Sequence, residues 1–143
     1  MNKLDPTTLF SIFEQGDEEV YKEHNIAEVL KNPYVLMGMV VSGIENFHLI
    51  NKIYTIKYKE EYEKVRNKIK YKYYTKLHLH LTRITLEEVQ ESYGIGDGFD
   101  LDRCLEALNE LLEYFQNLEQ YEKCATIVKY TDLLYGKKLE ILR

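Results

Sequence analysis

The side chains most able to do chemistry in this sequence are carboxylates and imidazoles at short spacings. Glu45 and His48 have the Glu-x-x-His spacing with which di-iron bundles place ligands on a helix. Such a site needs two of these motifs and two further glutamates, and the chain has one motif, so we interpret the pair as a polar helix face. His78 and His80 would share one face of a strand and could there bind a metal, but on a helix they point about 200° apart. Because no Cys or Asp lies near them to complete four ligands, we expect no metal site.

The other reactive groups do not form a recognisable catalytic set. The glycine-rich stretch at residues 94–98 follows no strand pattern and has no Lys-Ser/Thr pair, unlike a phosphate-binding loop. Cys104 and Cys124 have no histidine on an obvious common face, and we predict that both thiols are reduced and not bonded to each other. We therefore expect no catalytic residue and no cofactor, and predict that the protein is not an enzyme.

The best functional candidate is a Lys/Tyr-rich segment at residues 52–76. Lysines neutralise phosphates, and tyrosines stack on unpaired bases at about 1–3 kcal/mol for each base. Three lysines, Lys57, Lys64 and Lys68, lie on the opposite flank of the helical pattern. The possible nucleic-acid contacts are Lys52, Lys59, Arg66, Lys70, Tyr71 and Tyr74.

The charge distribution sets this segment apart from the rest of the chain. Positions 1–50 contain three basic and eight acidic residues, a net charge of −5. Positions 51–83 contain ten basic and three acidic residues, a net charge of +7. Positions 84–143 contain six basic and thirteen acidic residues, a net charge of −7. A basic middle between acidic flanks has two explanations. The flanks fold back on the middle and neutralise it, or the middle faces a polyanion or an acidic partner.

The element that must position this segment is a long helical run from Pro33 to Tyr74. No proline or glycine interrupts the pattern after Gly43, so it predicts one long central helix of about 42 residues and roughly 60 Å. The shorter helices cannot cover such a rod, so part of its apolar stripe should be exposed as a partner-binding site. A kink near Ser42 or Thr55 would instead let the chain cover itself. The exposed stripe residues that we expect to bind a partner or a second copy are Tyr58, Tyr62, Val65, Ile69 and Tyr73.

Capping signals predict the remaining helices. Helix starts are predicted at Asp5-Pro6, Asp17 and Asn32-Pro33. A capping box is predicted from Thr85 to Glu88. A further helix is predicted from its cap at Asp100 to about Gln116, with Phe99 as a hydrophobic staple. Residues 75–84 fit a strand or a helix, and we favour a helix with a kink near Thr75. A second capping box at residues 117–120 starts a helix that stops at Gly136, so residues 100–136 form an antiparallel hairpin.

Residues 119–127, Glu-Gln-Tyr-Glu-Lys-Cys-Ala-Thr-Ile, carry a family resemblance. They resemble the UVR motif of bacterial excision-repair proteins, a helical hairpin used for protein–protein contact. In that family an Arg-Asp pair follows two small residues, and Val128-Lys129 replaces it here. The resemblance implies a partner-binding surface and nothing catalytic.

Taken together, the sequence predicts an all-α helical bundle with one long central helix and a C-terminal antiparallel hairpin. It forms a single domain over residues 1–143, with the N-terminal helices and the basic helix in residues 1–93. We expect a non-catalytic adaptor or assembly protein, with an accessory nucleic-acid-binding protein as the alternative. The sequence is rich in tyrosine and lysine, lacks motifs and is compact, and in these respects it resembles small bacteriophage proteins. The resemblance implies a virion or connector component or a modulator of host machinery. We place it in the cytoplasm of the host or in the virion, because the N-terminus lacks the apolar core of a signal peptide and no apolar run would span a membrane.

Overall fold

The computed structural model describes residues 32–92 and 100–141, and these residues form α-helices with no strand among them. The prediction of an all-α helical bundle is confirmed for this part of the chain. The expected helices within residues 5–31 and the staple at Phe99 lie outside the described residues. The helices are α2 (Pro33–Tyr58), α3 (Glu60–Thr82), α4 (Leu86–Ser92), α5 (Leu101–Asn117) and α6 (Tyr121–Ile141).

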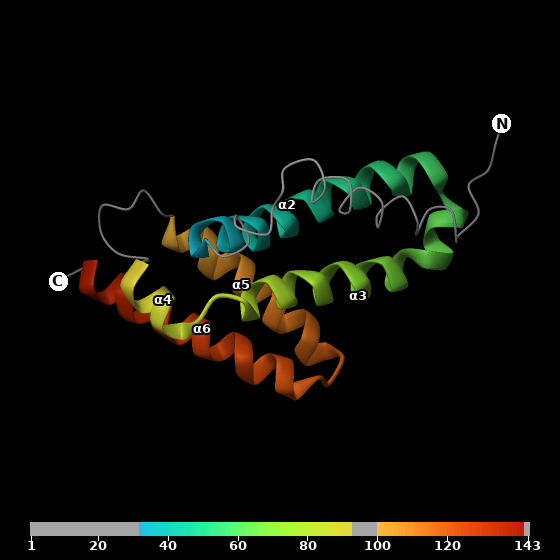
Figure 1. Cartoon of the computed structure of the whole chain (residues 1–143). Coiled ribbons are helices and arrows are strands. Elements are labelled where there is room, and N and C mark those ends of the chain that lie inside the picture. The colour runs from blue at the N-terminus through green and yellow to red at the C-terminus, as the bar shows by residue number, and fades with distance from the viewer. Residues whose placement is uncertain (1–31, 93–99, 142–143) are drawn as a thin grey trace.

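The prediction of one long central helix is wrong, because the run breaks at Lys59. This residue has φ 47° and ψ −114°, and the chain reverses there so that α3 returns antiparallel along α2 (Figure 1). A positive φ at a residue with a Cβ costs about 1–3 kcal/mol, whereas burying one large apolar side chain contributes about 1.5–3 kcal/mol. Several side chains of α3 become buried on reversal, so the fold-back outweighs the strain.

Aromatic and polar contacts join the two helices next to this reversal. The Tyr54 ring packs edge-on against Tyr58 and Tyr62, with centroids 5.1 and 5.8 Å away. The Tyr62 hydroxyl donates a hydrogen bond to Asn51 Oδ1 over 2.8 Å. From there α3 continues through Thr75 to Thr82 as one helix, which confirms the helical interpretation for residues 75–82. The interruption that we expected near Thr75 is wrong, because the helix is continuous there and ends instead at Thr82.

Three of the four helix starts predicted within the described residues are confirmed by their hydrogen bonds. Asn32 Oδ1 accepts from the Tyr34 amide over 2.9 Å, and Asp100 Oδ1 accepts from the Arg103 amide over 3.1 Å. Thr85 and Glu88 form a reciprocal capping box, with hydrogen bonds of 2.9 and 3.1 Å.

Two predictions about helix ends are wrong. Asn117 is the last residue of α5 and does not cap α6, which begins after a short turn containing Glu119 at φ 59°. Gly136 does not stop α6, which runs on to Ile141. An isolated glycine costs a helix only about 1 kcal/mol, and packing of α6 on its neighbours offsets that amount.

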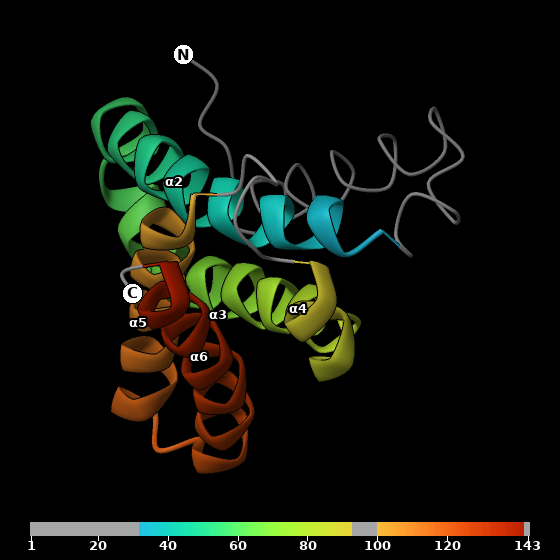
Figure 2. The same cartoon turned by 90° about the vertical axis from the view of Figure 1, so that its left-hand side faces the viewer.

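The described part of the molecule is built from two antiparallel helical hairpins, α2–α3 and α5–α6, which pack on each other (Figures 1 and 2). The predicted C-terminal hairpin is therefore present. The shared core is formed mainly by aliphatic and aromatic residues, including Leu36, Phe47, Tyr74, Leu81, Leu108, Phe115 and Ile127. The short helix α4 packs on α6, and the Tyr130 hydroxyl of α6 donates a hydrogen bond to the Ile84 carbonyl.

Both cysteines lie in this core as free thiols, which confirms that prediction. Burial raises the pKa of the Cys104 thiol to about 12, so this thiol stays protonated at neutral pH. Because the thiolate is the reactive form, neither position nor protonation favours nucleophilic chemistry at Cys104.

Candidate functional site

The most concentrated group of polar and aromatic side chains lies where α2, α3 and α5 meet. The Lys70 ammonium of α3 lies over three rings, with centroids 6.0 Å away for Phe47, 5.3 Å for Tyr74 and 5.2 Å for Tyr114. Each ring presents the negative face of its quadrupole to the cation, and such contacts contribute about 0.5–2 kcal/mol. Lys70 therefore helps to hold the helices together.

A hydrogen-bond network lies beside this aromatic cluster. Glu110 of α5 contacts His48 Nε2 of α2 through Oε1 at 2.6 Å, and its Oε2 accepts from the Tyr74 hydroxyl of α3 at 2.9 Å. Burial and the Glu110 carboxylate raise the pKa of Tyr74, and burial raises the pKa of Tyr114 to about 12. Both phenols are therefore neutral at neutral pH, and Tyr74 acts as a hydrogen-bond donor. We name His48, Tyr74 and Glu110 the three-helix joint.

An open cleft of about 560 Å³ lies over this joint. Its lining combines tyrosine rings with polar side chains, and both oxygens of Glu110 are already hydrogen-bonded to other side chains. The joint connects three helices, and its geometry leaves no nucleophile next to a free base. The side chains around the cleft are His48, Asn67, Lys70, Tyr71, Glu113 and Asn117, among others.

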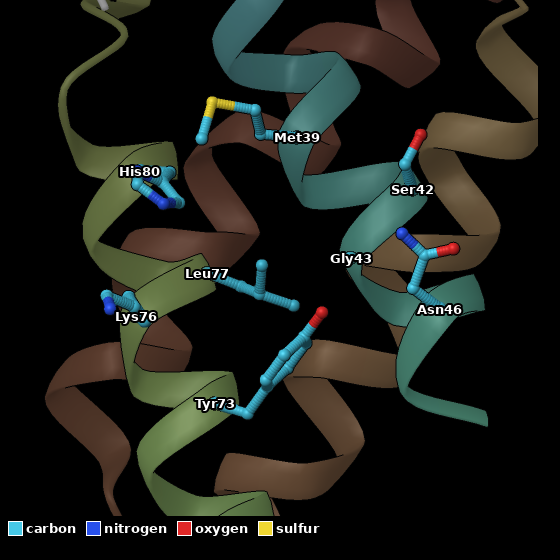
Figure 3. A pocket seen from close by; sticks show the side chains of 8 residues that line it. All are labelled: Met39, Ser42, Gly43, Asn46, Tyr73, Lys76, Leu77 and His80. Carbon is cyan, nitrogen blue, oxygen red and sulfur yellow. The ribbon is translucent and has the colours of Figure 1, made fainter. Parts of the chain in front are cut away.

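A second cleft, of about 230 Å³, lies between α2 and α3 (Figure 3). Leu77 and Tyr73 point from α3 toward α2, where Gly43 lets the two helices approach closely. The titratable side chains that line it are Tyr73, Lys76 and His80, and none of these is a carboxylate.

The stripe that we expected to be exposed is covered by the chain itself. Tyr62, Val65 and Ile69 are buried, and Tyr58 and Tyr73 are half-buried against the core. The prediction that these five residues form an exposed partner-binding strip is wrong, because α3 folds back and lays its stripe against α2.

The six predicted nucleic-acid contacts fall into two groups. Lys52, Lys59 and Tyr71 are exposed, as a contact with nucleic acid would require, although the Tyr71 hydroxyl accepts a hydrogen bond from Gln120 Nε2 over 3.2 Å. Arg66, Lys70 and Tyr74 are engaged within the chain. Arg66 pairs with Glu63 and lies over the Tyr62 ring, Lys70 lies among aromatic rings, and Tyr74 is fully buried. Our expectation that Tyr74 is available for other contacts is wrong.

The Glu-x-x-His pair is also accounted for by contacts between helices. Glu45 forms an ion pair with Arg103 of α5, and His48 contacts Glu110. Within the described residues, no group of three or more His, Cys, Asp or Glu side chains could hold a metal ion. His78, packed on the Phe115 ring, has its pKa lowered by burial and by Lys123.

Sequence reasoning missed three exposed apolar side chains on α2. Leu49, Ile53 and Ile56 are 58%, 46% and 76% exposed and lie on one face at the i, i+4, i+7 spacing. The spacing was visible in the sequence, but α2 is apolar on its other faces as well, so nothing in the pattern marked these three residues as the exposed ones. We name these three residues the α2 ridge.

Comparisons with protein-family models, with curated proteins and with solved structures find no match to this chain. The resemblance of residues 119–127 to the UVR motif thus rests on those residues alone. None of the described helices combines the length and the apolar character that a membrane crossing requires.

Proposed function

We propose that this protein is a non-catalytic helical adaptor or assembly protein and that the α2 ridge binds a protein partner. The observation that carries the proposal is the exposure of Leu49, Ile53 and Ile56 on one helix face. A contiguous exposed apolar strip on a folded domain marks a contact surface, since leaving it in water forgoes about 25 cal/mol for each Å².

The neighbours of the ridge indicate the chemistry of the partner. Lys52 and Lys57 are exposed on either side of it, and the ridge itself contains no acidic side chain. A protein groove with an apolar floor and an acidic rim would complement both features. A virion or connector component, or a modulator of host machinery, would work through a surface of this kind.

The experiment is affinity capture from the native host with a ridge variant, Leu49→Ser/Ile53→Ser/Ile56→Ser. We expect partners bound by the wild type to be lost with this variant, because its apolar contact area is removed. The control is Leu79→Ser/Leu118→Ser, which replaces exposed leucines on α3 and in the turn before α6. Partners that bind the ridge variant as well as the wild type would contradict the proposal.

The alternative function, nucleic-acid binding, is supported by a different observation. Lys64 and Lys68 are exposed on α3 and form no ion pair within the described residues, and Tyr71 is exposed nearby. This is the flank opposite Arg66 and Lys70. Lysines around an exposed aromatic ring suit single-stranded nucleic acid, in which a base can stack on the ring.

Titration with single-stranded and double-stranded oligonucleotides at two salt concentrations tests this alternative. We expect Lys64→Glu/Lys68→Glu to weaken binding and to flatten its salt dependence, because fewer phosphates are neutralised. Glu106→Lys is a control for charge reversal on another helix. An affinity that the lysine variant leaves unchanged would remove nucleic-acid binding as a function of this face.

A further inference from the structure

A second row of exposed residues lies on α6, which runs along the edge of the bundle (Figure 1). Tyr121, Val128, Tyr135 and Leu139 are 64%, 38%, 43% and 62% exposed, and Ala125 and Asp132 are also exposed. The steps between successive members alternate between four and three residues, which is the spacing of the a and d positions of a heptad repeat. We name Tyr121, Ala125, Val128, Asp132, Tyr135 and Leu139 the α6 seam.

The seam is separate from the face that α6 uses within its own chain. Cys124, Ile127, Tyr130 and Leu134 are buried on the inner side, where α6 packs on α5 and α4. The Tyr135 hydroxyl accepts a hydrogen bond from Asn109 Nδ2 over 3.4 Å, but the residue stays exposed. The helix therefore has one apolar face inside the bundle and a second, heptad-spaced face outside it.

We propose that the α6 seam binds the α6 seam of a second copy of this chain, with the two helices antiparallel. In an antiparallel pair the a position of one helix lies opposite a d position of the other. The seam is self-complementary in that arrangement about its midpoint near residue 130. Tyr121 lies opposite Leu139 of the second copy, and Val128 lies opposite Asp132. Ala125 lies opposite Tyr135, so the smallest side chain of the seam meets a large ring.

Charge complementarity selects the antiparallel orientation. Asp132 and Lys129 are exposed, and neither forms an ion pair within the part of the chain that the structure describes. In the antiparallel register, Asp132 of one copy comes beside Lys129 of the other, and the two-fold axis repeats the pair. In a parallel pair Asp132 would instead face its own counterpart, which is repulsive, and Ala125 would face Ala125 and leave a gap.

The length of the seam sets the scale of the interaction. Tyr121 and Leu139 are 18 residues apart, which corresponds to about 27 Å of helix. A contact confined to one helix pair of this length belongs with small, transient interfaces. We therefore expect a reversible monomer–dimer equilibrium with Kd on the order of 1–100 μM.

Charge exchange across the seam tests both the partner and the orientation. Sedimentation velocity over a range of concentrations measures the dimer fraction. Asp132→Lys should weaken the dimer, because the new lysine faces Lys129 of the second copy, and Lys129→Asp should weaken it by the mirror-image repulsion. Mixing the two variants should restore a heterodimer, since both contacts then join opposite charges. Glu106→Lys, a charge reversal on α5, should leave the equilibrium unchanged.

Thermal unfolding of each variant keeps this test separate from folding, because the exchanged residues are exposed and should leave the monomer fold intact. A wild-type protein that stays monomeric at every concentration would overturn the proposal. A dimer that survives both single variants would place the interface elsewhere and would also overturn it. The test does not involve the α2 ridge, so its failure is distinguishable from failure of the proposed adaptor function.

Discussion

Two glycines of α2 show that the surroundings of a residue determine whether the structure can accept a larger side chain there. A Cβ at Gly43 would lie 2.5 Å from Leu77 Cδ2 of α3, whereas a Cβ at Gly38 would meet no atom within 4 Å. Leu77 is buried, so it has little room to move away. Gly43 is therefore needed for the close approach of α2 and α3, and Gly38 is not needed for packing.

We predict opposite outcomes for the same substitution at these two positions. Gly38→Ala should raise the free energy of unfolding by about 0.5–1 kcal/mol, because alanine restricts the unfolded chain and favours the helix. Gly43→Ala makes the same gain but forces Leu77 aside, at a cost of about 1–3 kcal/mol. Urea denaturation with matched m-values measures both. Equal stabilities of the two variants would show that Leu77 adapts freely.

At the scale of the elements, the deciding feature is the reversal at Lys59. Its φ of 47° and ψ of −114° place it in a backbone region that glycine adopts without a Cβ penalty. Its side chain makes no capping hydrogen bond at the start of α3. The lysine side chain thus contributes little to a turn that its own Cβ strains.

We predict that Lys59→Gly stabilises the protein by about 0.5–2 kcal/mol, because relief of strain exceeds the added entropy of the unfolded chain. Lys59→Ala is the matched control, since it removes the charged side chain and keeps the Cβ. Thermal and urea unfolding should rank the glycine variant above both the alanine variant and the wild type. A glycine variant less stable than the alanine variant would contradict this account of the turn.

The turn at Lys59 also shows which features of the fold can be predicted from the sequence and which cannot. Local signals predicted the helix starts at Asn32, Thr85 and Asp100, because a cap depends only on residues within one turn of helix. The helical period also placed Tyr62, Val65 and Ile69 correctly on one face. It could not show what covers that face, because lysine is a good helix former and nothing at position 59 signals a reversal. The reversal depends on contacts between α2 and α3, which are distant along the chain.

The candidate site was predictable to a smaller extent for a related reason. The types of Lys70 and Tyr74 suggested contacts with nucleic acid, but their surroundings come from three separate helices. Periodicity within one helix gives no information about rings on its neighbours. The α2 ridge was hidden for the opposite reason, since an apolar residue next to other apolar residues gives no sign of exposure.

At the scale of the whole molecule, the two proposed contact surfaces lie on different hairpins. The α2 ridge belongs to the α2–α3 hairpin and the α6 seam to the α5–α6 hairpin. Under both proposals, a dimer formed through α6 would present two ridges. A partner with repeated binding sites would then engage both, and the second contact would form at a high effective concentration. Such an arrangement depends on the two hairpins holding a fixed geometry.

The three-helix joint supplies part of that fixed geometry, and it yields our last prediction. Glu110→Ala should lower the free energy of unfolding by about 1–3 kcal/mol, because the fully buried Tyr74 hydroxyl then has no acceptor. Tyr74→Phe removes the donor instead and should cost about 0.5–1.5 kcal/mol. The double variant should cost less than the sum, because no buried hydroxyl is left unpaired. Glu113→Ala, at an exposed position of the same helix, should change stability by less than about 0.5 kcal/mol. Strict additivity in urea denaturation would show that Glu110 and Tyr74 act independently, and the Tyr74–Glu110 contact would then have no role in holding the two hairpins together.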